Sequence, residues 1–195
     1  MNNAKGEMRE FLFRGLMFEA DASRFQSAGI QVGADMGQAE ERLLSEALAP
    51  FSVTLRNNSI EMARLYSVLH CFENEVRTLI KEKLEEKEGS DWADKLPKKV
   101  KDAAEARQKT AFLDSWLEGE KSNILGFVDF SHLSSIILEK WSVFEDIVPT
   151  QHWLKQRMDE LEKVRNFIAH NRMLLPSEFN RIYLYIADWN RVIGL

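Results

Sequence analysis

Apolar residues recur at three- and four-residue spacing along much of the chain, and this periodicity predicts amphipathic helices. It is clearest in "SIEMARLYSVLHCFENEVRTLIKEKLEEK", residues 59–87. Ser59 stands where an N-cap is expected, and Gly89 where a helix should end. The apolar stripe of this long helix comprises Met62, Leu65, Leu69, Phe72, Val76, Leu79 and Leu84.

Four more helices are expected after this one. Their sequences are "KKVKDAAEARQKTAFLDSWLEG" ending at Gly119, "DFSHLSSIILEKWSVF" with Asp129 as cap, "QHWLKQRMDELEKVRNFIAHNRML" after Thr150, and "SEFNRIYLYIADWNRVI" after Pro176. Strand signals are nearly absent, since there are no Asn-Gly or Asp-Gly turns and little alternation. Short connections favour antiparallel neighbours. We therefore predict an all-α protein, with an up-and-down bundle of four or five helices over residues 51–195.

The first fifty residues differ from the rest of the chain. Four glycines interrupt two weakly amphipathic stretches, "EFLFRGLMFEA" and "QAEERLLSEALA", and Pro50 follows them. We treat residues 1–50 as an N-terminal helical extension whose role the sequence does not indicate.

Composition narrows the class of protein. Of 195 residues, 45% are hydrophobic, enough to bury a core. The net charge of −5 argues against a general nucleic-acid coat protein, although residues 151–195 carry a net +2. The single cysteine, Cys71, excludes an internal disulfide and fits a reducing compartment. No apolar run reaches the ~20 residues of a membrane helix, so we expect a cytoplasmic protein without a membrane partner.

Three polar residues stand out within "EKVRNFIAHNRMLLP". On a helix, Asn166 and His170 lie about 40° apart on one edge, whereas Arg165 lies about 140° from His170. The long arginine side chain can fold toward the histidine, or it can serve a symmetry-related copy of the site. The simplest alternative is that these residues form the polar edge of a surface helix.

These three side chains suit one reaction, the metal-independent cleavage of RNA. Histidine can give or take a proton near neutrality, as deprotonation of a ribose 2′-OH requires. Arginine keeps its charge and binds phosphate oxygens through paired donors. Asparagine can orient the imidazole or donate to a phosphate oxygen. Preorganised donors of this kind contribute a few kcal/mol, roughly, in a transition state.

The motif "RNFIAH" resembles the R-x4-H signature of HEPN domains (higher eukaryotes and prokaryotes nucleotide-binding). The flanking "AHNRMLL" and the upstream "SVLHCFENEVRTLI" are similar to the bacterial HEPN branch named for the Swt1 ribonuclease. The resemblance covers roughly residues 55–192. It leaves the first fifty residues unexplained.

The resemblance implies a metal-independent endoribonuclease that leaves 2′,3′-cyclic phosphate ends and needs no cofactor. Such domains form homodimers in which two motifs share a cleft, and they act in toxin–antitoxin, abortive-infection and anti-phage systems. Carried over, Arg165 and His170 are catalytic and Asn166 is auxiliary, while Asn171 and Arg172 are candidates to contact flanking RNA phosphates. A related group is modified on a tyrosine two places after the histidine. Here that place holds Arg172, so we do not expect this regulation.

Alternatives remain open at this point. The domain can keep the motif yet act as an inactive module that binds RNA, a nucleotide or a protein partner. A third hypothesis makes the chain one half of a toxin–antitoxin pair. The i,i+4 pair of Glu73 and Arg77 is most simply a surface ion pair, although Glu73 can instead face the cleft. The basic stretch "KLPKKVK" is either a solvated turn or a guide for RNA. No zinc-site spacing is present, so we expect no metal.

Overall fold

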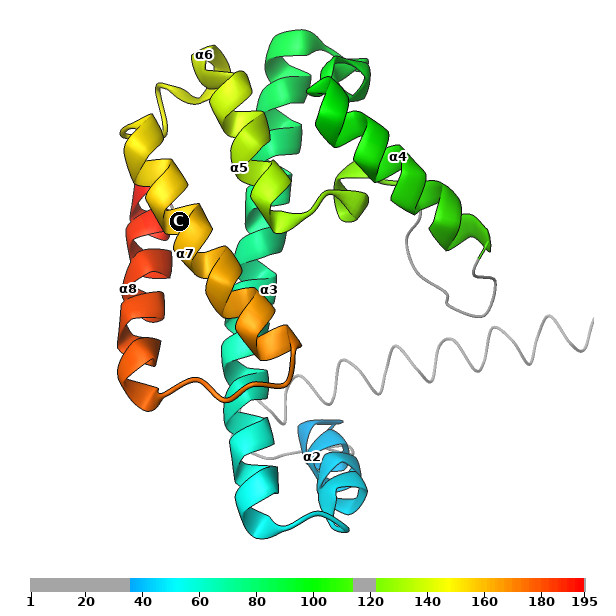
Figure 1. Ribbon diagram of the computed structural model, residues 1–195, viewed down its shortest axis with the longest axis vertical. Helices are drawn as coiled ribbons and strands as arrows, with labels where there is room; N and C mark the ends of the chain where they lie inside the picture. Colours follow the sequence, from blue (N-terminus) through cyan, green and yellow to red (C-terminus); the bar gives the residue numbers. More distant parts are fainter. Residues whose placement is uncertain (1–35, 114–121, 195) are drawn as a thin grey trace, which may run out of the picture. The chain divides into compact units, whose positions relative to one another are not determined.

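The computed structural model describes residues 36–113 and 122–194. All regular structure in these residues is helical, which confirms the predicted all-α class. The elements are α2 (Met36–Leu48), α3 (Val53–Glu88), η1 (Trp92–Lys95), α4 (Lys98–Leu113), η2 (Ile124–Phe127), α5 (Phe130–Glu139), α6 (Trp141–Phe144), α7 (Gln151–Ala169) and α8 (Pro176–Ile193). Figure 1 shows them in chain order.

The chain divides into two compact units, Met1–Arg56 and Asn57–Leu195. In the first unit, the second of the two amphipathic stretches forms α2. The first stretch lies outside the described residues, as does most of the expected extension.

The long helix α3 begins earlier than the sequence suggested. Ser59 was expected to cap it, but α3 starts at Val53, so that prediction was wrong. The hydroxyl of Ser52 accepts the N–H of Leu55 at 3.3 Å, which is the bond of an N-cap. Ser52 and Ser59 are both possible N-caps by residue type. The apolar stripe alone does not determine how far the helix extends on its N-terminal side.

Within the second unit, successive helices alternate in direction as an up-and-down bundle. α3, α5 and α8 ascend in Figure 1, whereas α4 and α7 descend. α5 packs against α7, and α4 packs against η2. The predicted stripe of α3 faces the core: five of its seven members are buried, namely Leu65, Leu69, Phe72, Val76 and Leu84.

Helix ends follow the expected chemistry in part. Thr150 accepts the N–H of Trp153 at 3.1 Å, and Gly89 ends α3 with φ +82°, as predicted. Pro176 begins α8. The expected third helix breaks at Lys140 into α5 and α6.

Two other predicted helix ends, at Asp129 and Gly119, are not confirmed. Asp129 occupies an N-cap position but makes no capping bond, because its carboxylate pairs with Arg107 instead. The predicted stop at Gly119 lies outside the described residues. Within the described part of the chain, no helix is long and apolar enough to cross a bilayer.

Candidate functional site

Arg165 lies on the side of α7 that faces α3, with its side chain 33% exposed. Its Nη1 donates to Oδ1 of the adjacent Asn166 at 3.0 Å. Its Nε lies 3.4 Å from Oε2 of Glu73, an ion pair without hydrogen-bond geometry, since the buried Nε has no hydrogen-bond partner. The guanidinium therefore folds toward α3 rather than toward His170.

Glu73 is the residue of α3 that receives this guanidinium. It is only 6% exposed, and its other oxygen pairs with Nη2 of Arg77. The prediction of a surface ion pair was therefore wrong, because Glu73 is buried and its carboxylate faces α7. One buried carboxylate lies between two guanidiniums, so the cluster keeps a net positive charge, and such a cluster favours an anion nearby.

Arg77 anchors the cluster to the loop that holds η2. Its Nε donates to the carbonyl of Leu125 at 2.9 Å, and its Nη2 donates to the carbonyl of Val128 at 3.2 Å. Because four of its five N–H donors have hydrogen-bond partners, this arginine is structural. Arg165, with fewer internal bonds, is the guanidinium of the pair that can turn to a ligand.

The C-terminal end of α7 closes in a Schellman motif. Its backbone bonds are His170 N–H to Asn166 C=O at 3.1 Å, Asn171 N–H to Ile168 C=O at 2.8 Å and Arg172 N–H to Phe167 C=O at 3.3 Å. Asn171 takes the left-handed conformation, with φ +59°. Asparagine is among the few residues besides glycine that tolerate this region. Asn171 therefore has a backbone role that the sequence analysis missed, although an asparagine two places after Ala169, where α7 ends, was the available signal.

The side chains at this helix end are exposed. His170, Asn171 and Arg172 all face solvent, and the guanidinium carbon of Arg172 lies 5.5 Å from the ring centre of Phe167. The structure thus brings Arg165 and Asn166 into direct contact with each other. It records no contact between His170 and Arg165 among the described residues. The result is a guanidinium held between α3 and α7, with an exposed imidazole at the end of the same helix.

α8 holds α7 in place through a mixed aromatic and polar contact. Trp189 is buried against Trp153 and Phe72. Hydrogen bonding by the Tyr185 hydroxyl lowers the pKa of the Glu160 carboxyl, and the same interaction raises the pKa of Tyr185. These contacts lie toward the start of α7 and fix the helix that carries the motif.

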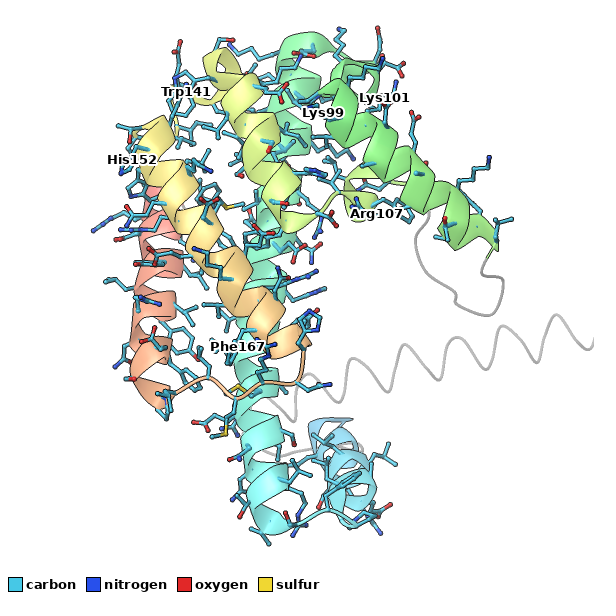
Figure 2. All side chains as sticks on the ribbon, in the orientation of Figure 1. Lys99, Lys101, Arg107, Trp141, His152 and Phe167 are labelled. Carbon is cyan, nitrogen blue, oxygen red and sulfur yellow. The ribbon has the colours of Figure 1, made fainter. Side chains whose placement is uncertain are left out.

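The basic stretch at the start of α4 lies away from this cluster. Figure 2 shows Lys99 and Lys101 at the opposite end of the bundle from Phe167. Lys101 also donates to Asp94 at 2.7 Å, which lowers the pKa of Asp94. His152, in the first turn of α7, is likewise remote from Phe167 in Figure 2.

No group of three His, Cys, Asp or Glu side chains among the described residues can hold a metal ion.

Comparison with protein-family models gives a match to Swt1-like HEPN over residues 67–194. The matched range includes Glu73 and Arg77 of α3 as well as the whole of α7 and its Schellman motif. Searches of curated proteins and of solved structures found no match.

Proposed function

Because the chain belongs to the Swt1-like HEPN family, which suggests a ribonuclease or nucleotide-binding function, we propose that it is a metal-independent endoribonuclease. The observation that supports this most is the cluster of Glu73, Arg77 and Arg165. The cluster carries a net positive charge on α7, the helix whose C-terminal end carries the exposed imidazole of His170. These are the groups that a phosphodiester and its 2′-OH require.

In the proposed reaction, neutral His170 accepts the proton of a ribose 2′-OH. The 2′ oxygen attacks phosphorus, the bond from phosphorus to the 5′ oxygen breaks, and an imidazolium returns a proton to that leaving oxygen. Arg165 stabilises the charge on the phosphate oxygens. Asn166, bonded to Nη1 of Arg165, positions the guanidinium. The products end in 2′,3′-cyclic phosphate and 5′-hydroxyl.

We further propose that the site is completed in a homodimer. Within one chain, Arg165 turns toward α3 and makes no recorded contact with His170, so a second copy is needed to place both groups on one phosphate. An apolar surface lies beside the motif, because Met173 is 50% and Leu175 is 64% exposed. They follow the turn formed by His170, Asn171 and Arg172, here called the catalytic turn. Two exposed apolar residues in this place suit a symmetric contact that brings two such turns together.

A toxin or anti-phage role follows from this activity as a proposal. An RNA-cleaving protein harms its own cell unless it is restrained, so a partner protein that acts as an antitoxin or defence component is expected. Expression of the chain in a bacterial host should arrest growth, and the His170→Ala variant should not. Growth arrest by both forms would show that the toxicity does not depend on RNA cleavage by His170.

A second candidate is an inactive module that binds RNA or a nucleotide. It is favoured by the internal bonds of Arg165 and by the net charge of −5. The two candidates differ in one observable. The inactive module would bind RNA without cleaving it, and its binding would not change in the His170→Ala variant.

The nature of the RNA ends tests the proposed chemistry. Single-stranded RNA is incubated with the full chain in EDTA, and the fragments are analysed by mass spectrometry. We expect 2′,3′-cyclic phosphate and 5′-hydroxyl ends. Ends bearing 3′-hydroxyl and 5′-phosphate, or activity that EDTA abolishes, would show a metal-dependent route instead.

A further inference from the structure

We propose that His70 of α3 is an additional RNA-binding residue, which donates the N–H of its Nδ1 to a phosphate oxygen beside Arg165. The inference rests on the proposed function, because it takes RNA as the ligand. It assigns a residue outside the R-x4-H motif, on a different helix. Asn74, Arg77 and the Glu73–Arg165 pair connect His70 to that motif.

The orientation of the Asn74 amide is fixed by two neighbours. Its Oδ1 accepts from Nη1 of Arg77 at 3.2 Å, and its Nδ2 donates to the backbone carbonyl of His70 at 2.8 Å. A guanidinium cannot accept a hydrogen bond, and a carbonyl cannot donate one. If the amide were rotated by 180°, its NH2 group would face the N–H of Arg77 and its oxygen would face the carbonyl oxygen of His70. Neither pair could form a hydrogen bond.

This orientation fixes the imidazole of His70 in turn. The second N–H of Asn74 Nδ2 points at Nε2 of His70, 3.2 Å away. Because Nδ2 can only donate, Nε2 must accept with its lone pair, and the ring proton is then carried by Nδ1. Among the described residues, no hydrogen bond uses Nδ1 of His70, and the side chain is exposed. The structure therefore presents an oriented, unused N–H donor.

The position of His70 along α3 corresponds to the end of α7. Arg165 faces Glu73, and in the connection that follows α7 the N–H of Leu174 contacts Sδ of Met62 at 3.4 Å. His70 lies between Met62 and Glu73 on α3, and the catalytic turn lies between Arg165 and Leu174. The two helices run antiparallel (Figure 1), so His70 and the turn lie at one level of the helix pair. An RNA strand that reaches Arg165 therefore has His70 at a neighbouring level of the helix pair.

The charges around His70 favour an anion. Arg77 and Arg165 share the single carboxylate of Glu73, so the cluster carries a net positive charge. Tyr66, whose ring centre lies 6.5 Å from that of His70, is neutral as a phenol. A neutral N–H donor next to a cationic cluster adds a directed bond to a phosphate without adding charge.

The test is RNA binding by the full chain in a His170→Ala background, which prevents cleavage. A fluorescent 20-nucleotide single-stranded RNA is titrated with this protein and with versions that also carry His70→Ala or His70→Asn. We expect His70→Ala to weaken binding about tenfold, since a hydrogen bond to a charged group contributes about 1.5 kcal/mol or more. Asparagine offers an N–H near the place of Nδ1, so His70→Asn should recover most of the affinity. His152→Ala, far from the site, is the matched control.

Salt dependence separates a neutral donor from a charged contact. The slope of log Kd against log salt should stay unchanged in His70→Ala, whereas Arg165→Ala should reduce it by about 0.7. Unchanged affinity, a reduced slope in His70→Ala, or failure of asparagine to restore binding would overturn the role of His70 alone. If the parent chain neither binds nor cleaves RNA, the proposed function falls and the role of His70 with it.

Discussion

Oε2 of Glu73 on α3 lies 3.4 Å from Nε of Arg165 on α7, and the carboxylate is buried where the two helices meet. Through this pair, a helix near the start of the bundle positions the arginine of the R-x4-H motif. Arg77 holds the other oxygen of Glu73 and ties it to the loop around η2. The motif is therefore supported by residues that its own sequence pattern does not contain.

Replacing Glu73 with glutamine should affect both stability and cleavage. The amide keeps the shape of the side chain but leaves two guanidiniums without their counter-charge in a buried place. We expect the free energy of unfolding to fall by about 1–3 kcal/mol. RNA cleavage should fall further than the loss of folded protein explains, because Arg165 is no longer held. Urea denaturation and cleavage rates at low temperature measure the two effects.

The matched control is Asp159→Asn on α7. Asp159 pairs with Lys155 at 3.2 Å, but the two side chains are 43% and 63% exposed, so solvent screens the pair. Such pairs contribute little, so unfolding should change by no more than about 0.5 kcal/mol. Equal effects of Glu73→Gln and Asp159→Asn would show that the buried carboxylate has no special role.

Asn171 allows its backbone role to be separated from contact with RNA. Asn171→Gly keeps the left-handed turn and removes the side chain, so stability should hold. Asn171→Ala should cost about 1 kcal/mol, since alanine is strained at φ +59°. If Asn171→Gly also preserves RNA affinity, the side chain does not touch RNA, and the prediction of a flanking-phosphate contact is wrong. Thermal unfolding and RNA titration are the measurements.

The contact between Glu160 and Tyr185 should make stability depend on pH. The pKa of Glu160 is lowered from 4.5 by hydrogen bonding with Tyr185, so this stabilisation is present above pH 4.5 and is lost as pH falls through the lowered value. The pKa of Tyr185 is raised from 10.0, so its part is present below pH 10 and is lost as pH rises further. Tyr185→Phe should therefore destabilise the protein most near neutral pH. A difference from the wild type that stays constant between pH 2 and pH 7 would contradict the coupling.

Dimerisation through the turn after α7 can be tested at Leu175. This residue is the N-cap of α8, where aspartate is a favoured residue, so Leu175→Asp should not unfold the helix. In analytical ultracentrifugation we expect a dimer for the wild-type chain and a monomer for Leu175→Asp, with cleavage lost in the latter. A wild-type monomer that cleaves RNA would exclude the shared cleft.

The sequence predicted the fold well where strong local signals mark the helices. Thr150 caps α7 and Pro176 begins α8 as expected, and the apolar spacing on α3 identified its buried face, but α7 ends at Ala169 and not at Leu174 as predicted. The start of α3 was missed because Ser52 and Ser59 carry the same capping signal. Only the extent of backbone hydrogen bonding decides between them.

The candidate site was predictable only in part. The spacing of Arg165, Asn166 and His170 indicated the family, which the match over residues 67–194 shows, while the catalytic roles of these residues stay predictions. The environment of Glu73 was not predictable, since i,i+4 spacing with Arg77 is the same for a surface pair and a buried one. Which residue of another helix faces Glu73 depends on the packing of α3 against α7, and no single segment encodes that.

The most direct test of the account is the rate of RNA cleavage in EDTA by four proteins: the wild-type chain, Arg165→Ala, His170→Ala and the control His152→Ala. The account predicts cleavage by the wild type and by His152→Ala. It predicts a loss of about a hundredfold or more in the other two, because each removes a group that acts on the reacting phosphodiester. Undiminished cleavage by His170→Ala, or no cleavage by the wild-type protein on any RNA, would contradict it.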